Sequence, residues 1–165
     1  MEIISSKDNK KIKEARKLLT KKYRKNSYLI EGFHLLEEAL KAGRSIKQIF
    51  VEENKLTKLT EMIGSEKSLT DLSVNLVSKE VLKSLADSES PQGLIAEVTK
   101  IEEVIDFSAA KFLLLENVQD PGNVGTMIRT ADAAGFSAVI LLGETADIYS
   151  PKVMRSMQGS NFHLP

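Results

Sequence analysis

Residues 111–135 read KFLLLENVQDPGNVGTMIRTADAAG, a pattern that predicts a strand, a turn and a helix in succession. The apolar run at residues 112–115 is typical of a strand buried on both faces. Residues 117–123 are rich in turn formers, and residues 124–134 have helical periodicity with Arg129 off the apolar face. A glycine-rich turn followed by a helix presents backbone N–H groups and, here, an arginine to an anion.

Composition excludes several classes of protein. The chain has 165 residues, 42% hydrophobic and 28% charged, which is typical of a globular protein of one or two domains. It has no cysteine, which excludes disulfides and thiolate metal sites, and its two histidines make us expect no metal site. We find no apolar run long enough for a signal peptide or a membrane span, so we expect a cytoplasmic protein with no membrane partner.

The net charge of +0 hides a strongly basic N-terminus. Residues 1–25 carry ten lysines and arginines against three acidic residues, a local charge of +7 that the remaining residues balance. Affinity for phosphates depends on such local clustering rather than on the total charge. Two interpretations stay open at this point, a nucleic-acid contact and an ordinary solvated helix face.

The first hundred residues predict an alternating α/β layer structure. We expect a helix from Ser5 or Ser6 to about Lys22, and then β-α-β-α-β-α-β over residues 27–98. The next segment, TKIEEVIDFS, is acidic and weakly periodic, and we interpret residues 99–110 as a linker or short helix.

The second part predicts two parallel strands joined by a helix. A further buried strand is expected at residues 137–142, and Pro151 fits the first turn of a helix that ends near Gly159. Two strands cannot cover both faces of a parallel sheet. We therefore expect this domain to continue beyond Pro165 in a natural parent, and the 165-residue chain to expose apolar surface.

The residues alone leave the chemistry open. PGNVG matches neither the Walker loop nor the dinucleotide-binding fingerprint. Asn123 could serve only as a helix N-cap, and Arg129 could pair with Asp132 one turn later. Position argues for a function, because open α/β sheets bind ligands just beyond the carboxyl ends of their strands.

Several longer stretches resemble one family, the SpoU/TrmH RNA ribose methyltransferases of the knotted SPOUT class. Its first conserved motif and following segment resemble ENVQDPGNVGTMIRTADAAGFSAVILL (116–142) and YSPKVMRSMQGSNFHLP (149–165). Its N-terminal substrate-binding domain resembles KKYRKNSYLIEGFHLLEEALKAG (21–43) and SKEVLKSLADSESPQGLIAEV (78–98). Met157 departs from the pattern, since many relatives have a small residue there.

The resemblance implies a fold. It is an L30e-like α/β domain that binds RNA over residues 1–98, a linker over 99–110, and the first part of a knotted, Rossmann-like parallel-sheet domain over 111–165. The motifs that form the knot and bind S-adenosylmethionine would lie C-terminal to Pro165. Accordingly we expect no cofactor-binding residue, and no bound cofactor, in residues 1–165.

The resemblance also implies an activity, transfer of a methyl group from S-adenosylmethionine to a ribose 2′-hydroxyl of ribosomal or transfer RNA by a homodimeric parent. Arg129 and Asn123 become the candidate catalytic residues, with Arg129 touching the RNA. The basic N-terminus supplies further RNA contacts, at Lys17, Lys21, Lys22, Arg24 and Lys25. The alternatives are a non-catalytic RNA-binding module and, in third place, an unrelated α/β protein that binds ATP or NAD.

Overall fold

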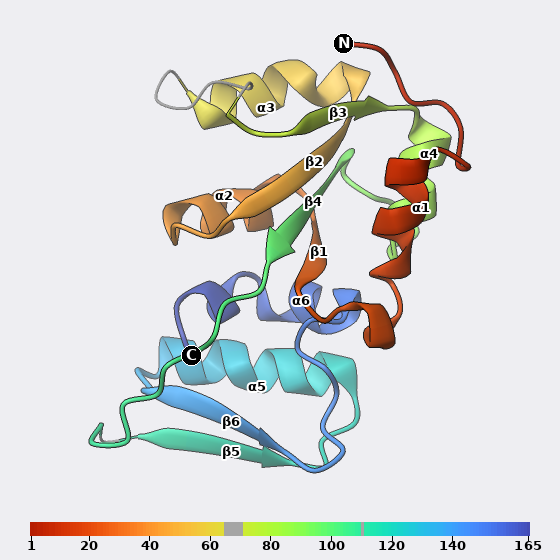
Figure 1. The fold of residues 1–165 in the computed structure, drawn as a ribbon. Coiled ribbons are helices and arrows are strands. Elements are labelled where there is room, and N and C mark those ends of the chain that lie inside the picture. Colours follow the sequence, from red (N-terminus) through yellow and green to blue (C-terminus); the bar gives the residue numbers. More distant parts are fainter. Residues whose placement is uncertain (65–70, 110) are drawn as a thin grey trace. The chain divides into compact units, whose positions relative to one another are not determined.

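The chain forms two compact units, residues 1–100 and 101–165, in a computed structural model that describes residues 1–64, 71–109 and 111–165 (Figure 1). The first unit is called the N-terminal unit and the second the C-terminal unit. Each has its own sheet, and each is described by itself.

The N-terminal unit confirms the expected alternation of strands and helices. Its elements are α1 (Lys10–Lys17), η1 (Lys21–Tyr23), β1 (Ser27–Glu31), α2 (Phe33–Lys41), β2 (Ile46–Glu52), η2 (Glu53–Lys55), α3 (Leu56–Ile63), β3 (Val74–Val77), α4 (Lys79–Leu85) and β4 (Leu94–Thr99). Ser78 caps α4 as its sequence predicts, since its hydroxyl accepts a hydrogen bond from the Val81 amide at 3.2 Å.

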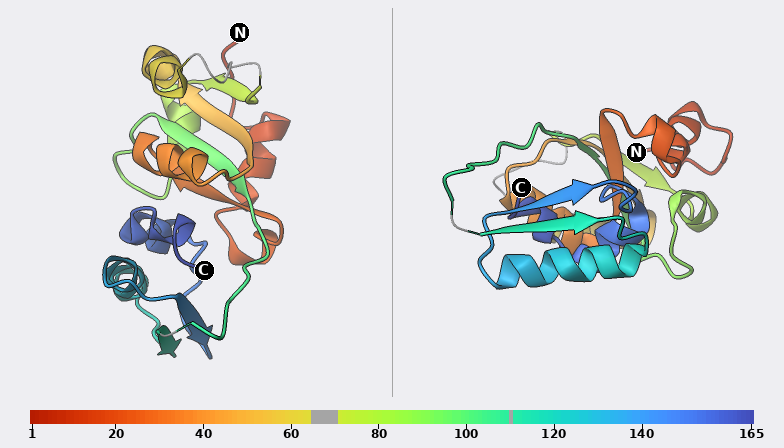
Figure 2. Two further views of the ribbon diagram at one scale, coloured as in Figure 1. Left: turned by 90° about the vertical axis from the view of Figure 1, so that its left-hand side faces the viewer. Right: turned by 90° about the horizontal axis from the view of Figure 1, so that it is seen from below.

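The four strands form a mixed sheet in the order β1-β4-β2-β3. Strands β2 and β3 are parallel, whereas β4 runs antiparallel to both β1 and β2. Helices α1 and α4 lie on one face of the sheet, and α2 and α3 lie on the other (Figures 1 and 2). The core beneath α1 and α4 includes Ile12, Phe50 and Leu82, all fully buried.

The first helix is shorter than its sequence predicts. It begins at Lys10 with Asn9 as N-cap, whose side chain accepts from the Lys11 amide at 2.9 Å, and it ends at Lys17. The expected start at Ser5 or Ser6 is wrong because Ile4 is held extended beside β3. There the Ile4 amide donates to Leu76 O at 2.8 Å, and Ile4 O accepts from the Ser78 amide.

The connection between the units contains no helix in its described part, which favours a linker over a short helix. Ala110, the last residue of the expected linker, lies outside the described residues. A turn forms at Asp106, where hydrogen bonds from the Ser108 hydroxyl and then the Ser108 amide lower the pKa of Asp106. Phe107 packs against Phe112 with ring centroids 6.0 Å apart.

The C-terminal unit has the predicted parallel β-α-β arrangement. Its elements are β5 (Phe112–Glu116), α5 (Pro121–Ala133), β6 (Ala138–Leu142), α6 (Pro151–Met157) and η3 (Ser160–Phe162). Strands β5 and β6 pair in parallel, with Leu113 opposite Val139. Helix α5 makes the crossover between them, as parallel strands require, and α6 packs on α5 (Figure 1).

The two strands are less buried than a continuous apolar run predicts. In β5 only Leu115 is buried, and Leu114 is 57% exposed. Strand β6 is mostly half-buried. The prediction of a strand covered on both faces is therefore wrong for these residues, because α5 covers one face of the pair and no described helix of this unit covers the other.

The second edge of β6 is engaged by the last residue of the chain. Leu142 O accepts from the Asn117 amide on the β5 side, at 3.2 Å. Because alternate residues of a strand point their N–H and C=O groups to opposite edges, Val139 faces away from β5. The Val139 amide donates to Pro165 O at 2.9 Å, so residue 165 lies along the edge opposite β5.

Packing of α5 against α6 depends on Gly125. A Cβ at this position would lie 2.9 Å from the backbone carbonyl carbon of Ser156 and closer still to the Ser156 side chain. The Ser156 hydroxyl also donates to Gly122 O at 2.9 Å. The two helix backbones are thus as close as a glycine allows, and Val124 and Met157 are fully buried around the contact.

We predict that Gly125→Ala destabilises the C-terminal unit by about 1–3 kcal/mol, because overpacking at a backbone contact forces the helices apart. Urea unfolding followed by circular dichroism, with amide exchange of α5 and α6, measures the effect. Gly122→Ala is the matched control. Its Cβ would approach only the Asp120 carboxylate, at 3.2 Å. A Gly125→Ala protein as stable as the Gly122→Ala protein would show that packing of α5 against α6 does not depend on Gly125.

Candidate active site and nucleic-acid interface

Helix α5 begins earlier than its glycines suggest. Asp120 is its N-cap, with Oδ1 accepting from the Asn123 amide at 2.9 Å, and Pro121 occupies the first turn. Asn123 therefore lies inside the first turn, and the interpretation of Asn123 as the N-cap is wrong. Aspartate caps as well as asparagine, and proline fits the first helical position, so Asp120–Pro121 starts the helix.

The loops that follow β5 and β6 are hydrogen-bonded to each other. Asn117 adopts a left-handed conformation, with φ 55°, and its Oδ1 accepts from the Glu144 amide at 2.8 Å. Gly143 lies directly against this side chain and leaves no room for a Cβ. The Thr145 hydroxyl bonds to Leu115 O at 3.0 Å and to Leu142 O at 2.7 Å. These bonds fix the loop from which α5 starts.

Asn123 and Arg129 are both exposed on α5. They are six positions apart, which corresponds to about 9 Å along the helix axis and roughly 120° around it. The structure therefore places both candidate catalytic residues on one rigid helix but does not bring their side chains together.

Arg129 is not neutralised by its nearest acidic neighbour in the sequence. The Asp132 carboxylate instead lies 3.2 Å from Nδ1 of His163. The alternative in which Arg129 pairs with Asp132 is not the arrangement found. Within the described parts of the chain, Arg129 presents an exposed positive charge one turn after Gly125.

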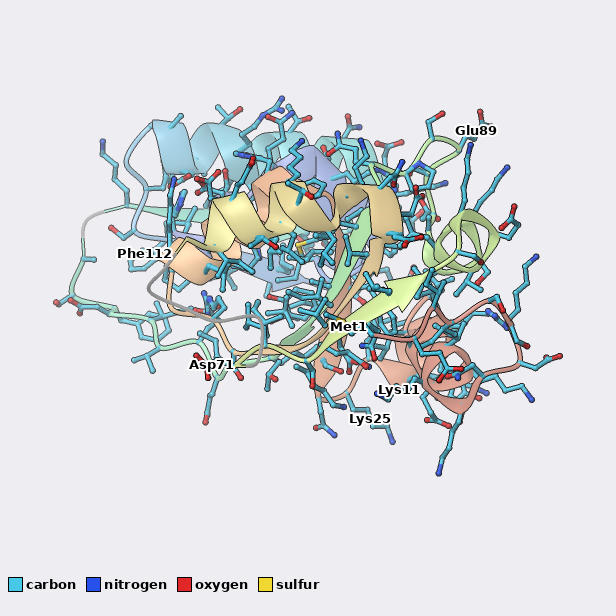
Figure 3. All side chains as sticks on the ribbon, turned by 90° about the horizontal axis from the view of Figure 1, so that it is seen from above. Met1, Lys11, Lys25, Asp71, Glu89 and Phe112 are labelled. Atoms are coloured by element: carbon cyan, nitrogen blue, oxygen red, sulfur yellow. The ribbon has the colours of Figure 1, made fainter. Side chains whose placement is uncertain are left out.

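The basic N-terminus divides into exposed and buried groups. Lys17, Lys21, Lys22 and Lys25 are exposed, and Lys25 is labelled in Figure 3. Lys17 forms an ion pair with Glu14, since its Nζ lies 3.1 Å from the Glu14 carboxylate. The Lys17 and Lys22 ammonium groups also lie 5.8 and 4.9 Å from the centre of the Tyr23 ring.

Arg24 does not belong to this exposed group. It is only 5% exposed, and its guanidinium donates to Leu18 O at 2.9 Å. Its own carbonyl accepts from the Lys100 ammonium. The expectation that Arg24 contacts RNA is wrong for this structure, because burial and these bonds make it an anchor of the α1–β1 connection.

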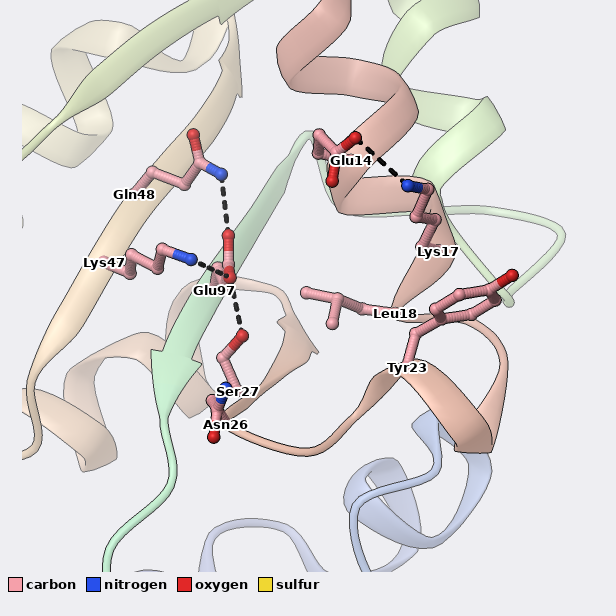
Figure 4. Close-up of a pocket in the computed structure, with 9 residues that line it drawn as sticks. All are labelled: Glu14, Lys17, Leu18, Tyr23, Asn26, Ser27, Lys47, Gln48 and Glu97. Atoms are coloured by element: carbon pink, nitrogen blue, oxygen red, sulfur yellow. Dashed lines mark hydrogen bonds and ion pairs between the residues drawn. The ribbon is translucent and has the colours of Figure 1, made fainter.

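One polar pocket was missed by reasoning from the sequence. It lies wholly in the N-terminal unit and has a volume of about 280 Å³ (Figure 4). At its floor is Glu97, a buried carboxylate in the middle of β4. The one signal in the sequence was an acidic residue inside the apolar run LIAEVT.

The described residues offer neither a metal cluster nor a membrane span. Among them, no three histidine, cysteine, aspartate or glutamate side chains are grouped so that they could hold a metal ion. None of the helices in the described ranges combines the length and the apolar character that crossing a membrane requires.

Two family models match the chain. Residues 9–96 match the MRM3-like substrate binding domain, and residues 110–165 match the SpoU rRNA Methylase family. The two matches fall in the N-terminal and C-terminal parts of the chain respectively.

Curated relatives are RNA methyltransferases by name. The 23S rRNA (guanosine(2553)-2′-O)-methyltransferase RlmP of Bacillus subtilis is 43% identical, over 100% of this chain and 64% of its own length. The mitochondrial rRNA methyltransferase 3 of Homo sapiens is 34% identical over 83% of this chain and 34% of its own length. The chain thus spans less than two thirds of the length of these relatives.

Solved structures agree with the same fold. The AdoMet-bound rRNA methyltransferase of Sinorhizobium meliloti superposes with a TM-score of 0.82 at 30% identity, covering 99% of this chain and 63% of that one. A structure described as an RNA 2′-O ribose methyltransferase gives a TM-score of 0.76 at 34% identity, with 99% and 64% covered. The expected mixed α/β fold with a parallel-sheet part is confirmed. The motif on α5 agrees with the two family models and with these relatives. The chain belongs to the SpoU/TrmH family of SPOUT-class RNA methyltransferases.

Proposed function

We propose that the protein to which these residues belong methylates the 2′-hydroxyl of a ribose in ribosomal or transfer RNA, with S-adenosylmethionine as the donor. The observation that carries the proposal is the exposed Arg129 on α5, inside the segment matched by the SpoU model. The printed names of the relatives support the substrate class. In this proposal residues 1–98 bind RNA, 99–110 link, and 111–165 form one wall of the methyl-transfer site.

Arg129 is the residue we assign to the RNA at the reacting nucleotide. A guanidinium stays protonated in proteins, which makes it a poor base and a good partner for phosphate oxygens. Two parallel N–H···O bonds to a phosphate would fix the ribose in both position and orientation. Orienting the hydroxyl toward the methyl group accounts for a large part of the lowering of the activation barrier in such two-substrate reactions.

Asn123 has a separate place in the proposal. Its side chain is exposed in the first turn of α5, where the helix N-terminus adds partial positive charge. Because it lies about 9 Å along the helix from Arg129, we assign the two residues to different groups of the bound RNA rather than to one atom.

The donor fits the described residues poorly. S-adenosylmethionine supplies an electrophilic methyl carbon when bound. At the carboxyl ends of β5 and β6, however, Asn117 Oδ1 already accepts from the Glu144 amide, and the Thr145 hydroxyl bonds to Leu115 O and Leu142 O. We therefore propose that the donor is held by the part of the relatives' length that these 165 residues do not cover.

An RNA-binding role without catalysis is the second candidate for residues 1–165 taken alone. It is favoured by the same closed loops and by the exposed lysines of the N-terminal unit. We also propose a cytoplasmic location, a homodimeric parent and no membrane partner.

Replacing Arg129 tests the catalytic assignment. In the product of the complete reading frame, Arg129→Ala should lower kcat/KM for methylation at least about a hundredfold, because the reacting ribose loses its anchor. Arg129→Lys should retain a part, since it keeps the charge but not the two-pronged geometry. Transfer of labelled methyl groups to transcribed 23S rRNA and tRNA measures the rate.

The matched control is Lys152→Ala, which removes an exposed basic residue from α6 of the same unit. It should leave the rate unchanged. Full activity of a folded Arg129→Ala protein would refute the role of Arg129.

Titration with S-adenosylmethionine tests where the donor binds. Isothermal calorimetry on residues 1–165 should give no measurable heat of binding, whereas the product of the complete reading frame should bind. Binding of the donor by residues 1–165 would show that our placement of its site is wrong.

Salt dependence tests the basic surface. In the triple variant Lys21→Ala, Lys22→Ala, Lys25→Ala, we expect weaker RNA binding and a log Kd versus log salt slope smaller by about 0.7–0.9 for each phosphate that the protein no longer neutralises. Fluorescence anisotropy with a labelled RNA measures both. Arg24→Ala is the contrast, because it removes a buried hydrogen bond and should lower the stability of the N-terminal unit by about 1–3 kcal/mol. An unchanged slope in the triple variant would remove these lysines from the interface.

A further inference from the structure

The polar pocket of the N-terminal unit has the shape and chemistry of a binding site. Its walls come from α1, the η1 turn and strands β1, β2 and β4 (Figure 4). Its volume of about 280 Å³ is near the lower end of small-molecule sites. One heterocyclic base fits a space of this size, whereas a folded peptide does not.

The floor of the pocket is an acceptor held in place from several sides. Glu97 is 4% exposed, and its Oε1 accepts from the Ser27 hydroxyl at 2.6 Å. Its Oε2 accepts from Nε2 of Gln48 at 2.6 Å, and Lys47 Nζ lies 3.2 Å from Oε1. A carboxylate has about four acceptor positions, so these three donors leave one for a ligand.

A β-bulge builds this arrangement. Neighbouring residues of a regular strand point to opposite faces, yet Lys47 and Gln48 both reach Glu97. The reason is a register shift between Ile46 and Gln48, where β2 carries one extra residue against β4. Bulges commonly re-aim side chains beside functional sites.

An aromatic ring forms the outer wall. Tyr23 is 45% exposed, and it follows directly on the lysines of η1. The chain next to it is anchored, because the following residue is the buried Arg24, which bonds to Leu18 O. The Lys17 and Lys22 ammonium groups lie over the ring, 5.8 and 4.9 Å from its centre, so a base that stacks on the ring takes the place of an ammonium group there. A half-exposed aromatic ring among lysines is a platform on which proteins stack an RNA base next to its phosphates.

The charges of the pocket argue against a simple anion site. Two lysines, Lys17 and Lys47, are balanced by two carboxylates, Glu14 and Glu97. A free phosphate would bring its negative charge against that of the Glu97 carboxylate. A neutral group with an N–H donor meets an acceptor instead.

We propose that this pocket binds one unpaired base of the RNA, stacked on Tyr23 and donating an N–H to the Glu97 carboxylate. The inference deepens the proposed function and rests on it for the identity of the ligand as RNA. It adds a base-reading contact to a surface whose lysines recognise only phosphate. The pocket thereby supplies a means of choosing a looped-out nucleotide.

The test compares ligands with and without a base. The four ribonucleoside 5′-monophosphates are titrated into the ¹⁵N-labelled 165-residue chain, and ribose 5-phosphate serves as the ligand that lacks the base. We expect nucleotides to shift the backbone amide signals of Ser27, Gln48 and Glu97, and ribose 5-phosphate to leave them in place. Equal shifts with both ligand types would overturn the proposal.

Variants at Tyr23 test the stacking wall. Tyr23→Leu should weaken nucleotide binding by roughly 5- to 100-fold, the range measured when a stacking ring is removed. Tyr23→Phe keeps the ring and should bind as the wild type does. The exposed position of Tyr23 makes both variants safe for folding, which the unshifted spectrum of the remaining residues verifies. Wild-type affinity in Tyr23→Leu would overturn the proposal.

The outcome is separable from that of the proposed function. Arg129→Ala should not alter nucleotide binding at the pocket. Base-dependent binding without methyl transfer by the complete protein would retain the pocket and refute the methyltransferase. Methyl transfer with no base-dependent shifts would refute the pocket alone.

Discussion

At Gly125 the backbone of α5 passes so close to Ser156 that no Cβ fits between the two helices. This close approach fixes the rotation of α5 about its own axis. The bond from the Ser156 hydroxyl to Gly122 O then holds the first turn of the helix from the same side. Because Arg129 follows Gly125 by one helical turn, the helix contact at Gly125 also sets the direction in which the Arg129 side chain leaves α5. The role proposed for Arg129 therefore depends on this helix packing as much as on the arginine itself.

The N-terminal unit is governed by a different constraint, the cost of burying a charge. An ionised carboxylate inside a sheet is strongly unfavourable unless donors surround it. Glu97 obtains them from Ser27 on β1 and from two consecutive residues of β2. The irregular pairing of β2 with β4 is explained by that requirement. The same donors leave the carboxylate facing a pocket whose other wall is aromatic.

Much of this architecture was predictable from the sequence, because periodicity, caps and glycines mark the ends of most elements. The order of strands and helices over residues 27–98 and the parallel β5–α5–β6 unit follow from such patterns. The errors have local causes. Ile4 joins β3 through a pairing across some 70 residues of sequence, which no local pattern reveals. Asp120 rather than Asn123 caps α5, since both residues are good caps and only the structure chooses. Arg24 occurs in a basic stretch of sequence that predicts an exposed surface, yet it is as buried as a core residue. The pocket around Glu97 could not be predicted, because it is assembled from four separate segments and a bulge.

Tyr23 has a spectroscopic consequence. The chain contains no tryptophan and three tyrosines, so fluorescence excited at wavelengths that phenylalanine does not absorb comes from tyrosine alone. Tyr28 is buried at 3% exposure, whereas Tyr23 stands in the wall of the pocket. A base stacked on that ring would quench its fluorescence. The N-terminal unit thus carries its own optical reporter, and occupancy of the pocket is readable in the unlabelled protein.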